Sequence, residues 1–143
     1  MFFNLDITTR GSDLMKSVIE GVCMHMRWLL ECTEKSFETN PVVRFSGGSA
    51  IAPYICQVMA DVLGRDVETI ESPRQVGAMG AAALTAVSLG MLDDIKDIKK
   101  IIKVDTTYKP NLANYEVYTK IMPVFKELHK NNKKAYEILN GGK

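Results

Sequence analysis

The chain has 143 residues, 46% of them hydrophobic and 24% charged, which is the size and composition of one globular domain. These values exclude collagen-like and disordered proteins. The formal net charge of +1 provides no strong field for nucleic acid or an anionic membrane, so neither is a predicted partner.

The sequence has the features of a cytosolic protein. No apolar run reaches the ~18 to 20 residues that span a bilayer, and the segment after Met1 lacks the basic and apolar regions of a signal peptide. The chain has three cysteines, Cys23, Cys32 and Cys56. Their number is odd, and no two of them form a C-x-x-C pair. We therefore predict a soluble, cytoplasmic protein whose thiols are buried and reduced.

The N-terminal part is predicted to be mainly one long helix. Residues 2–7 alternate weakly between apolar and polar, so they are candidates for an extended segment. Thr8, Thr9 and Ser12 are candidate N-caps for a helix that continues to about Phe37. Helical spacing predicts that the inward-facing positions are Leu14, Val18, Val22, Met26, Leu29 or Leu30, and Thr33.

A strand, a tight turn and a second helix are predicted next. Asn40-Pro41 ends the first helix, and the β-branched run that follows predicts a strand over residues 42–46. The helix is predicted over residues 52–63, with Gly64 placed to end it in the left-handed conformation.

A second strand is predicted over residues 67–71, where the pattern alternates with a period of two. Ser72-Pro73 then offers an N-cap followed by proline at the first helical position, and the helix runs to about Leu89. Gly77 and Gly80 each weaken a helix by roughly 1 kcal/mol relative to alanine. Close packing against a neighbouring backbone, or contact with a ligand, is the usual compensation.

The last third is predicted to be helical after a connection. Gly90 ends the previous helix, residues 93–102 form a short charged segment, and residues 103–110 read as a connection. The apolar spacing from Leu112 to Leu139 predicts a helix, in which Pro123 should cause a kink or a break. Its lysines most simply form a solvated face.

Two strands joined through a helix are a βαβ unit, whose strands should be parallel. Two strands alone do not make a stable sheet with helices on both faces. The chain is therefore predicted to be part of a domain, with sheet neighbours supplied from elsewhere.

The turn between the first strand and the second helix is the only candidate ligand site in the sequence. Gly47 and Gly48 lack a Cβ, so they can adopt positive φ and let a ligand approach the backbone. Amide groups at the following helix start would point toward a phosphate or ribose. A strand-to-helix turn that merely requires glycine explains the same residues, and the pattern alone does not separate the two.

Other chemistry is not supported by the sequence. His25 and His129 are distant in the chain and have no metal-ligand spacing with the cysteines. Ser46 and Ser49 do not form a G-x-S-x-G motif, and neither a Rossmann fingerprint nor a P-loop is present. Asp6 lacks the following glycine that an aspartate phosphate loop would need. No catalytic residue and no metal ligand is therefore nominated.

Most of the chain resembles the second half of a sugar kinase of the FGGY family. Three stretches carry the resemblance: Arg44-Phe45-Ser46-Gly47-Gly48-Ser49-Ala50 to the adenosine-motif turn, Gln57 through Arg65 to the following helix and turn, and Glu71-Ser72-Pro73 with Gly77 through Ala82 to the small-residue helix that closes the site. Among the members, xylulokinases are the most similar.

The resemblance implies a fold and a domain assignment. The expected fold is α/β and helix-rich, a partial ribonuclease-H-like ATPase domain of the actin/Hsp70/hexokinase type with a short parallel sheet. Residues 1–143 would be the C-terminal segment of the nucleotide-binding domain, ending in a helical tail from about residue 112.

The resemblance also implies the ATP contacts. Gly47 and Gly48 would lie against the adenosine and α-phosphate, with Ser49 beside them where the family often has a third glycine. Ala52 stands about where some relatives place an amide side chain, so here only its backbone is available. These four residues are the predicted ATP-binding residues.

The implied function is transfer of the γ-phosphoryl group of ATP, with Mg²⁺, to a hydroxyl of a ketose such as D-xylulose. The catalytic aspartate and the sugar pocket would lie in an N-terminal domain that this chain lacks, so the chain alone should be inactive. The alternatives are another FGGY branch, acting on glycerol, gluconate or ribulose, and a non-enzymatic self-associating helical module. A homodimer is one way in which a half-domain would bury its orphan surfaces.

Overall fold

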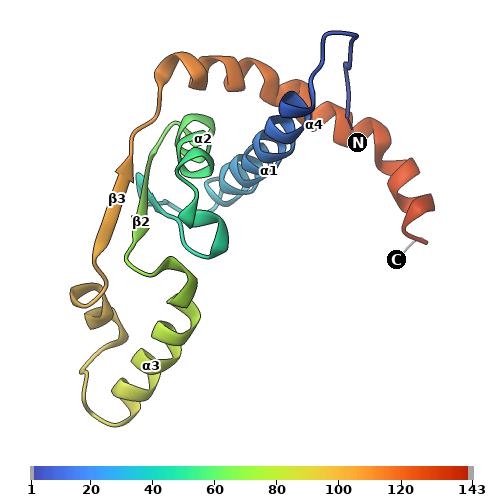
Figure 1. The fold of residues 1–143 in the computed structure, drawn as a ribbon. Coiled ribbons are helices and arrows are strands. Elements are labelled where there is room, and N and C mark those ends of the chain that lie inside the picture. Colours follow the sequence, from blue (N-terminus) through green and yellow to red (C-terminus); the bar gives the residue numbers. More distant parts are fainter. Residues whose placement is uncertain (1, 142–143) are drawn as a thin grey trace.

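A computed structural model of the chain describes residues 2–141 and arranges them as helices around a small sheet (Figure 1). In chain order the elements are α1 (Gly11–Thr33), β1 (Val42–Arg44), the 3-10 turn η1 (Gly48–Ile51), α2 (Pro53–Leu63), β2 (Asp66–Ile70), η2 (Pro73–Gln75), α3 (Val76–Ser88), η3 (Ile95–Lys100), β3 (Val104–Tyr108) and α4 (Leu112–Leu139). Among the described residues, no helix combines the length and the apolar character required to cross a membrane.

The start of α1 differs from the prediction that Thr8, Thr9 and Ser12 cap it. The N-cap is Arg10, whose N–H donates to Asp13 Oδ2 at 3.0 Å. Thr8 instead donates its N–H and its hydroxyl to Asp6 Oδ1, at 2.7 and 2.6 Å. These hydrogen bonds from Thr8 hold the pKa of Asp6 below its usual value. The hydroxyls of Thr8 and Thr9 both donate to Asp6, at most three residues away, so they do not cap α1.

The sheet contains the predicted βαβ unit and one strand more. β1 and β2 are parallel, with Val42 opposite Asp66, and α2 connects them. β3 pairs antiparallel with β2 on its other side, giving the order β1-β2-β3. The prediction that residues 103–110 are only a connection is therefore wrong, and the short sheet is mixed rather than purely parallel.

The core lies where α1, α2 and α4 meet next to β2. Its fully buried members include Cys23, Ala60, Val62 and Val67. Two buried polar side chains join the elements. Arg27 of α1 donates through Nη1 to the carbonyl of Val62 and to the hydroxyl of Thr119, both at 3.1 Å.

The second buried polar side chain that connects elements is that of Asp61 in α2, which is 4% exposed. Its carboxylate accepts hydrogen bonds from Gln57 Nε2, the Asn111 N–H and Asn114 Nδ2, each at 2.8 Å. Asn111 is the N-cap of α4 and accepts from the Ala113 N–H at 3.0 Å. Asp61 therefore ties the end of α2 to the start of α4.

α4 continues through Pro123 without the break that was one of the two predicted outcomes. Figure 1 shows the helix bent along its length rather than interrupted. A bend is the expected response because proline removes one backbone hydrogen bond and its ring crowds the preceding turn.

α3 and η3 form a limb, residues 72–102, that projects from one end of the sheet (Figure 1). The limb leaves after β2 and returns before β3, and the Glu71 N–H donates to the Lys103 carbonyl at 3.1 Å. Its two connections therefore lie side by side.

Candidate functional site

The glycine turn joins β1 to η1 and α2, and its first glycine has a conformation that other residues avoid. Gly47 has φ +100° and ψ −172°, a region that costs an L-residue substantial strain. Its N–H donates to the Pro73 carbonyl at 2.8 Å, which fixes the turn against η2. A Cβ at Gly47 would meet no atom within 4 Å, so the glycine is required by its backbone angles and not by crowding.

The next two residues present free amide groups at the start of η1. Gly48 and Ser49 are exposed, and no carbonyl precedes them within η1 to accept their N–H groups. The first backbone bond of this turn runs from the Ala50 N–H to the Gly47 carbonyl, at 3.2 Å. A Cβ at Gly48 would also meet nothing within 4 Å. The turn thus offers an open surface at which the N–H groups of Gly48 and Ser49 have no acceptor within η1.

Ala52 is the N-cap of α2, and its backbone is already occupied. Its N–H donates to the Ser49 carbonyl at 3.2 Å, and its carbonyl accepts from the N–H groups of Ile55 and Cys56, at 3.0 and 3.2 Å. What remains for a ligand at this position is the partly exposed methyl group.

The glycines of α3 are not explained by packing within the described part of the chain. A Cβ at Gly77 or at Gly80 would meet no atom within 4 Å outside its own helix. Just before this helix, Ser72 has φ +54°, an uncommon value for a residue other than glycine. The small-residue face of α3 is therefore open, as is the glycine turn to which η2 connects it.

Two hollows of the described chain lie away from the glycine turn. One, of about 530 Å³, surrounds Arg65 and Asp66, and the other, of about 810 Å³, lies between the N-terminal segment, α1 and α4. Neither hollow is lined by Gly47, Gly48 or Ser49, and the last two of these residues are exposed.

The histidines lie closer together than their separation in sequence indicated. Trp28 makes an edge contact with each of them, at ring-centroid distances of 6.2 Å to His25 and 5.4 Å to His129. His129 also stacks on Tyr136 at 5.7 Å. Within residues 2–141, however, no group of three or more His, Cys, Asp or Glu side chains is placed to hold a metal ion.

The prediction that all three thiols are buried is correct for two of them. Cys23 and Cys56 are buried, but Cys32 is exposed near the end of α1. Burial raises the pKa of Cys23 to about 11, so its thiol stays protonated at neutral pH.

Comparison with known proteins identifies relatives of this arrangement. Residues 1–89 match the family model described as the C-terminal domain of the FGGY family of carbohydrate kinases. A glycerol kinase of Mycoplasmopsis pulmonis is 28% identical over 116 residues, covering 80% of this chain and 23% of the relative. A xylulose kinase of Staphylococcus epidermidis is 25% identical over 123 residues, covering 85% of this chain and 25% of the relative. The chain thus spans about a quarter of the length of these curated relatives.

Solved structures with the same fold carry related names. A xylulose kinase of Lactobacillus acidophilus matches 97% of this chain with a TM-score of 0.86 and 21% identity, over 28% of its own length. A gluconate kinase of the same organism matches 92% of this chain with a TM-score of 0.82 and 21% identity, over 27% of its length. The backbone of this chain is therefore that of a segment found within longer proteins.

Proposed function

The chain belongs to the FGGY family of carbohydrate kinases, and we propose that it supplies the ATP-binding side of such a kinase. The helix-rich α/β fold predicted from the sequence agrees with the fold of the solved kinases. The observation that carries the proposal is the glycine turn, with its open surface and the N–H groups of Gly48 and Ser49 that have no acceptor within η1.

Four residues are proposed to contact ATP. Gly47 and Gly48 would lie against the adenosine and the α-phosphate, because a ligand can approach their backbone without meeting a side chain. Ser49 would add its N–H and its hydroxyl at the start of η1. Ala52 would contribute only an apolar contact, since its own amide and carbonyl are hydrogen bonded within the chain.

The reaction proposed for the complete kinase is transfer of the γ-phosphoryl group of ATP to a sugar hydroxyl. We assign the catalytic base and the sugar pocket to polypeptide outside this chain, because the chain spans only about a quarter of the length of its curated relatives. These residues also offer no site of three or more side-chain ligands for Mg²⁺. A magnesium ion would be held by the phosphates of ATP and by groups that this chain does not supply.

D-xylulose is the ketose that we propose as substrate, in keeping with the xylulose kinases among the relatives. Glycerol is the first alternative, since glycerol kinases match the chain at 26% to 30% identity. Gluconate and ribulose follow. A coupled assay of the complete kinase with all four substrates would identify the sugar. The cytoplasmic location predicted from the sequence is part of the same proposal.

Nucleotide binding can be tested on this chain directly by titration with MgATP in a calorimeter. Gly48→Asp places a negative charge beside the proposed α-phosphate position and should weaken binding at least tenfold. Gly11→Asp is the matched control, because it adds the same charge at another open glycine, at the start of α1. ATP affinity that is equal in Gly48→Asp and in the original chain would exclude the glycine turn as the site.

Two further outcomes test whether catalysis requires polypeptide outside this chain and whether the chain instead self-associates. This chain alone should show no xylulose-dependent ATP turnover, and turnover would contradict the assignment of catalysis to absent polypeptide. The non-enzymatic alternative, a self-associating helical module, is favoured by the exposed apolar side chains of α1. It would gain support if the chain associated with itself, bound no nucleotide and kept its association in Gly48→Asp.

A further inference from the structure

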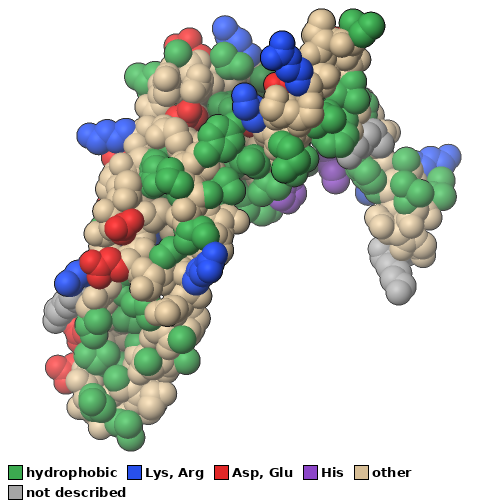
Figure 2. Space-filling model, viewed as in Figure 1, with side chains coloured by type: hydrophobic (Ala, Val, Ile, Leu, Met, Phe, Trp, Pro, Cys, Tyr) green, Lys and Arg blue, Asp and Glu red, His purple; other side chains and the backbone are tan. Residues whose placement is uncertain are grey.

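The glycine turn is held at its first residue by the base of the limb. The Gly47 N–H donates to the Pro73 carbonyl at 2.8 Å, and Pro73 is the first residue of η2. η2 packs against both η1 and α3. Figure 2 shows the limb extending away from the rest of the chain, with hydrophobic side chains on its surface. η2 is therefore the place where the limb meets the turn.

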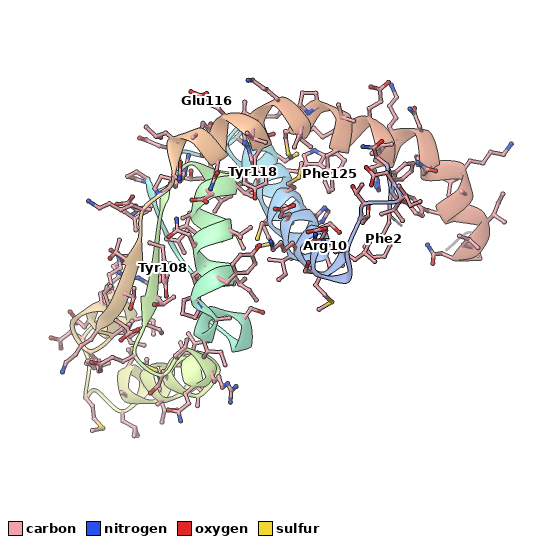
Figure 3. All side chains as sticks on the ribbon, turned by 45° about the horizontal axis from the view of Figure 1, so that its top comes forward. Phe2, Arg10, Tyr108, Glu116, Tyr118 and Phe125 are labelled. Carbon is pink, nitrogen blue, oxygen red and sulfur yellow. The ribbon has the colours of Figure 1, made fainter. Side chains whose placement is uncertain are left out.

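The turn is held at its other end from the interior of the chain. The Cys56 thiol of α2 is buried and donates to the Ala50 carbonyl of η1 at 3.4 Å. The side chain of Tyr108 lies against Cys56, and Figure 3 shows Tyr108 between β3 and α2. Gly48 and Ser49 lie between the two anchored ends, and their N–H groups have no acceptor within η1.

Ser72, the residue before Pro73, has a backbone conformation that its residue type disfavours. Its φ of +54° and ψ of +54° are left-handed, which is uncommon for a residue other than glycine. A residue that precedes proline also favours extended conformations. The Ser72 side chain is exposed and makes no capping hydrogen bond, so it does not compensate for the cost. Strained backbone of this kind persists where the surrounding structure fixes it, and it is concentrated at functional sites.

Backbone hydrogen bonds fix the chain on both sides of Ser72. Before it, the Glu71 N–H donates to the Lys103 carbonyl at 3.1 Å, which sets the position where the chain leaves β2. After it, the Pro73 carbonyl accepts from Gly47. If Ser72 adopted an extended conformation, the peptide that follows it would be redirected and the Pro73 carbonyl would no longer face Gly47. The left-handed conformation is therefore the link between the end of β2 and the start of the glycine turn.

We propose that Ser72 is a positioning residue for nucleotide binding, and this inference rests on the proposed function. Its left-handed conformation places the Pro73 carbonyl, which holds Gly47. The N–H groups of Gly48 and Ser49 are thereby kept in one arrangement before ATP arrives. A preformed turn binds more tightly, since it loses less conformational freedom when the ligand binds. Freeing about one residue of the turn should weaken ATP binding by roughly tenfold.

The test is a calorimetric titration of the full chain with MgATP in three variants of Ser72. Ser72→Val should weaken binding roughly tenfold, because a β-branched residue resists positive φ more strongly than serine does. Ser72→Asn should stay within about twofold of the original affinity, because asparagine adopts the left-handed conformation more readily than other residues except glycine. Ser72→Ala is a milder variant than Ser72→Val, and it should show a smaller loss in the same direction.

Asn4→Val is the matched control. Asn4 has φ +57°, is exposed and precedes α1, so valine there meets the same backbone conformation away from the glycine turn. Circular dichroism must show that the variants are folded, and urea unfolding compares their stabilities. Asn4→Val should lose stability as Ser72→Val does and still bind MgATP with the original affinity. A loss of affinity as large in Asn4→Val as in Ser72→Val would overturn the inference, since general destabilisation would then explain both.

Hydrogen exchange of the Gly47 amide, measured by NMR without nucleotide, tests the same inference independently of ATP. The protection of this amide should fall in Ser72→Val and remain in Ser72→Asn. Unchanged protection in Ser72→Val would overturn the inference, as would unchanged ATP affinity in that variant or an equal loss of affinity in Ser72→Asn. Failure of the original chain to bind MgATP would refute the proposed function, whereas the exchange of Gly47 would still decide whether Ser72 holds the turn.

Discussion

Replacing Asp61 by alanine should be the most destabilising single change among the polar residues of the described core. The carboxylate is 4% exposed and accepts three hydrogen bonds of 2.8 Å, from Gln57, Asn111 and Asn114. Hydrogen bonds to a charged group contribute about 1.5–3 kcal/mol each. Because water can reach the start of α4 once the carboxylate is gone, we expect a net loss of about 3–5 kcal/mol rather than the full sum.

Urea unfolding followed by circular dichroism measures this loss. With a slope of about 2 kcal/mol per molar urea for a chain of this size, the midpoint of Asp61→Ala should fall by roughly 2 M. Asp61→Asn keeps one acceptor oxygen and should lose about 1–2 kcal/mol. Glu68→Ala is the surface control, since its pair with Arg44 is exposed and contributes at most about 1 kcal/mol. Equal midpoints for Asp61→Ala and Glu68→Ala would refute the argument that the buried carboxylate holds α2 and α4 together.

Three further predictions concern other parts of the chain. Gly64→Ala should lower the free energy of unfolding by at least about 1 kcal/mol, which is the cost of φ +66° for an L-residue. The added Cβ would also lie 2.5 Å from the ring of Tyr115, which increases the cost. An unchanged urea midpoint would contradict this. Cys32 should react with a thiol reagent in the native protein while Cys23 should react only after unfolding, and mass spectrometry of the labelled sites would reveal the opposite order. Burial raises the pKa of Glu31, but hydrogen bonds from Lys126 and Arg27 outweigh this effect, so the pKa is lowered in the folded protein. The stability that Glu31 adds above its unfolded pKa should therefore be lost as the pH falls through its folded pKa. Glu31→Gln should reduce this loss of stability at acid pH, and an unchanged pH dependence would show that Glu31 does not cause it.

The sequence predicted the C-terminal ends of α2 and α3 well because the signals there are local, whereas α1 begins at other residues than predicted and ends at Thr33 and not near Phe37. Gly64 ends α2 in the left-handed conformation, with φ +66°, as its position after the apolar run indicated. Gly90 has φ +70° just beyond α3, again as expected. These ends depend on backbone angles that glycine adopts at little cost, and they require no knowledge of distant contacts.

β3 was missed because its reason lies outside its own residues. The run Val104–Tyr108 is polar in its middle and mostly exposed, so no apolar alternation marks it. Thr106 and Thr107 were the available signal, since β-branched residues favour strands. Their partners in β2 lie almost forty residues earlier, and only that pairing gives the segment its conformation.

The candidate site was found by its glycines, but its connections were not. The turn chemistry indicated Gly47 and Gly48, and the structure shows that only Gly47 has positive φ. The bond from the Gly47 N–H to the Pro73 carbonyl links segments that the sequence separates by a helix and a strand. Helical spacing identifies an apolar face of α1 without saying what covers it, and three residues predicted to face inward are exposed: Val18, Val22 and Met26.

The limb of residues 72–102 has a consequence for protein engineering. The Glu71 N–H donates to the Lys103 carbonyl, so the chain leaves β2 and returns to β3 at neighbouring positions. The limb is therefore an insertion between two paired strands. Replacing residues 72–102 with a short hairpin loop would keep β2 and β3 connected but would remove the Pro73 carbonyl that accepts from the Gly47 N–H. A protein shortened in this way would show which properties of the chain depend on the limb and which do not.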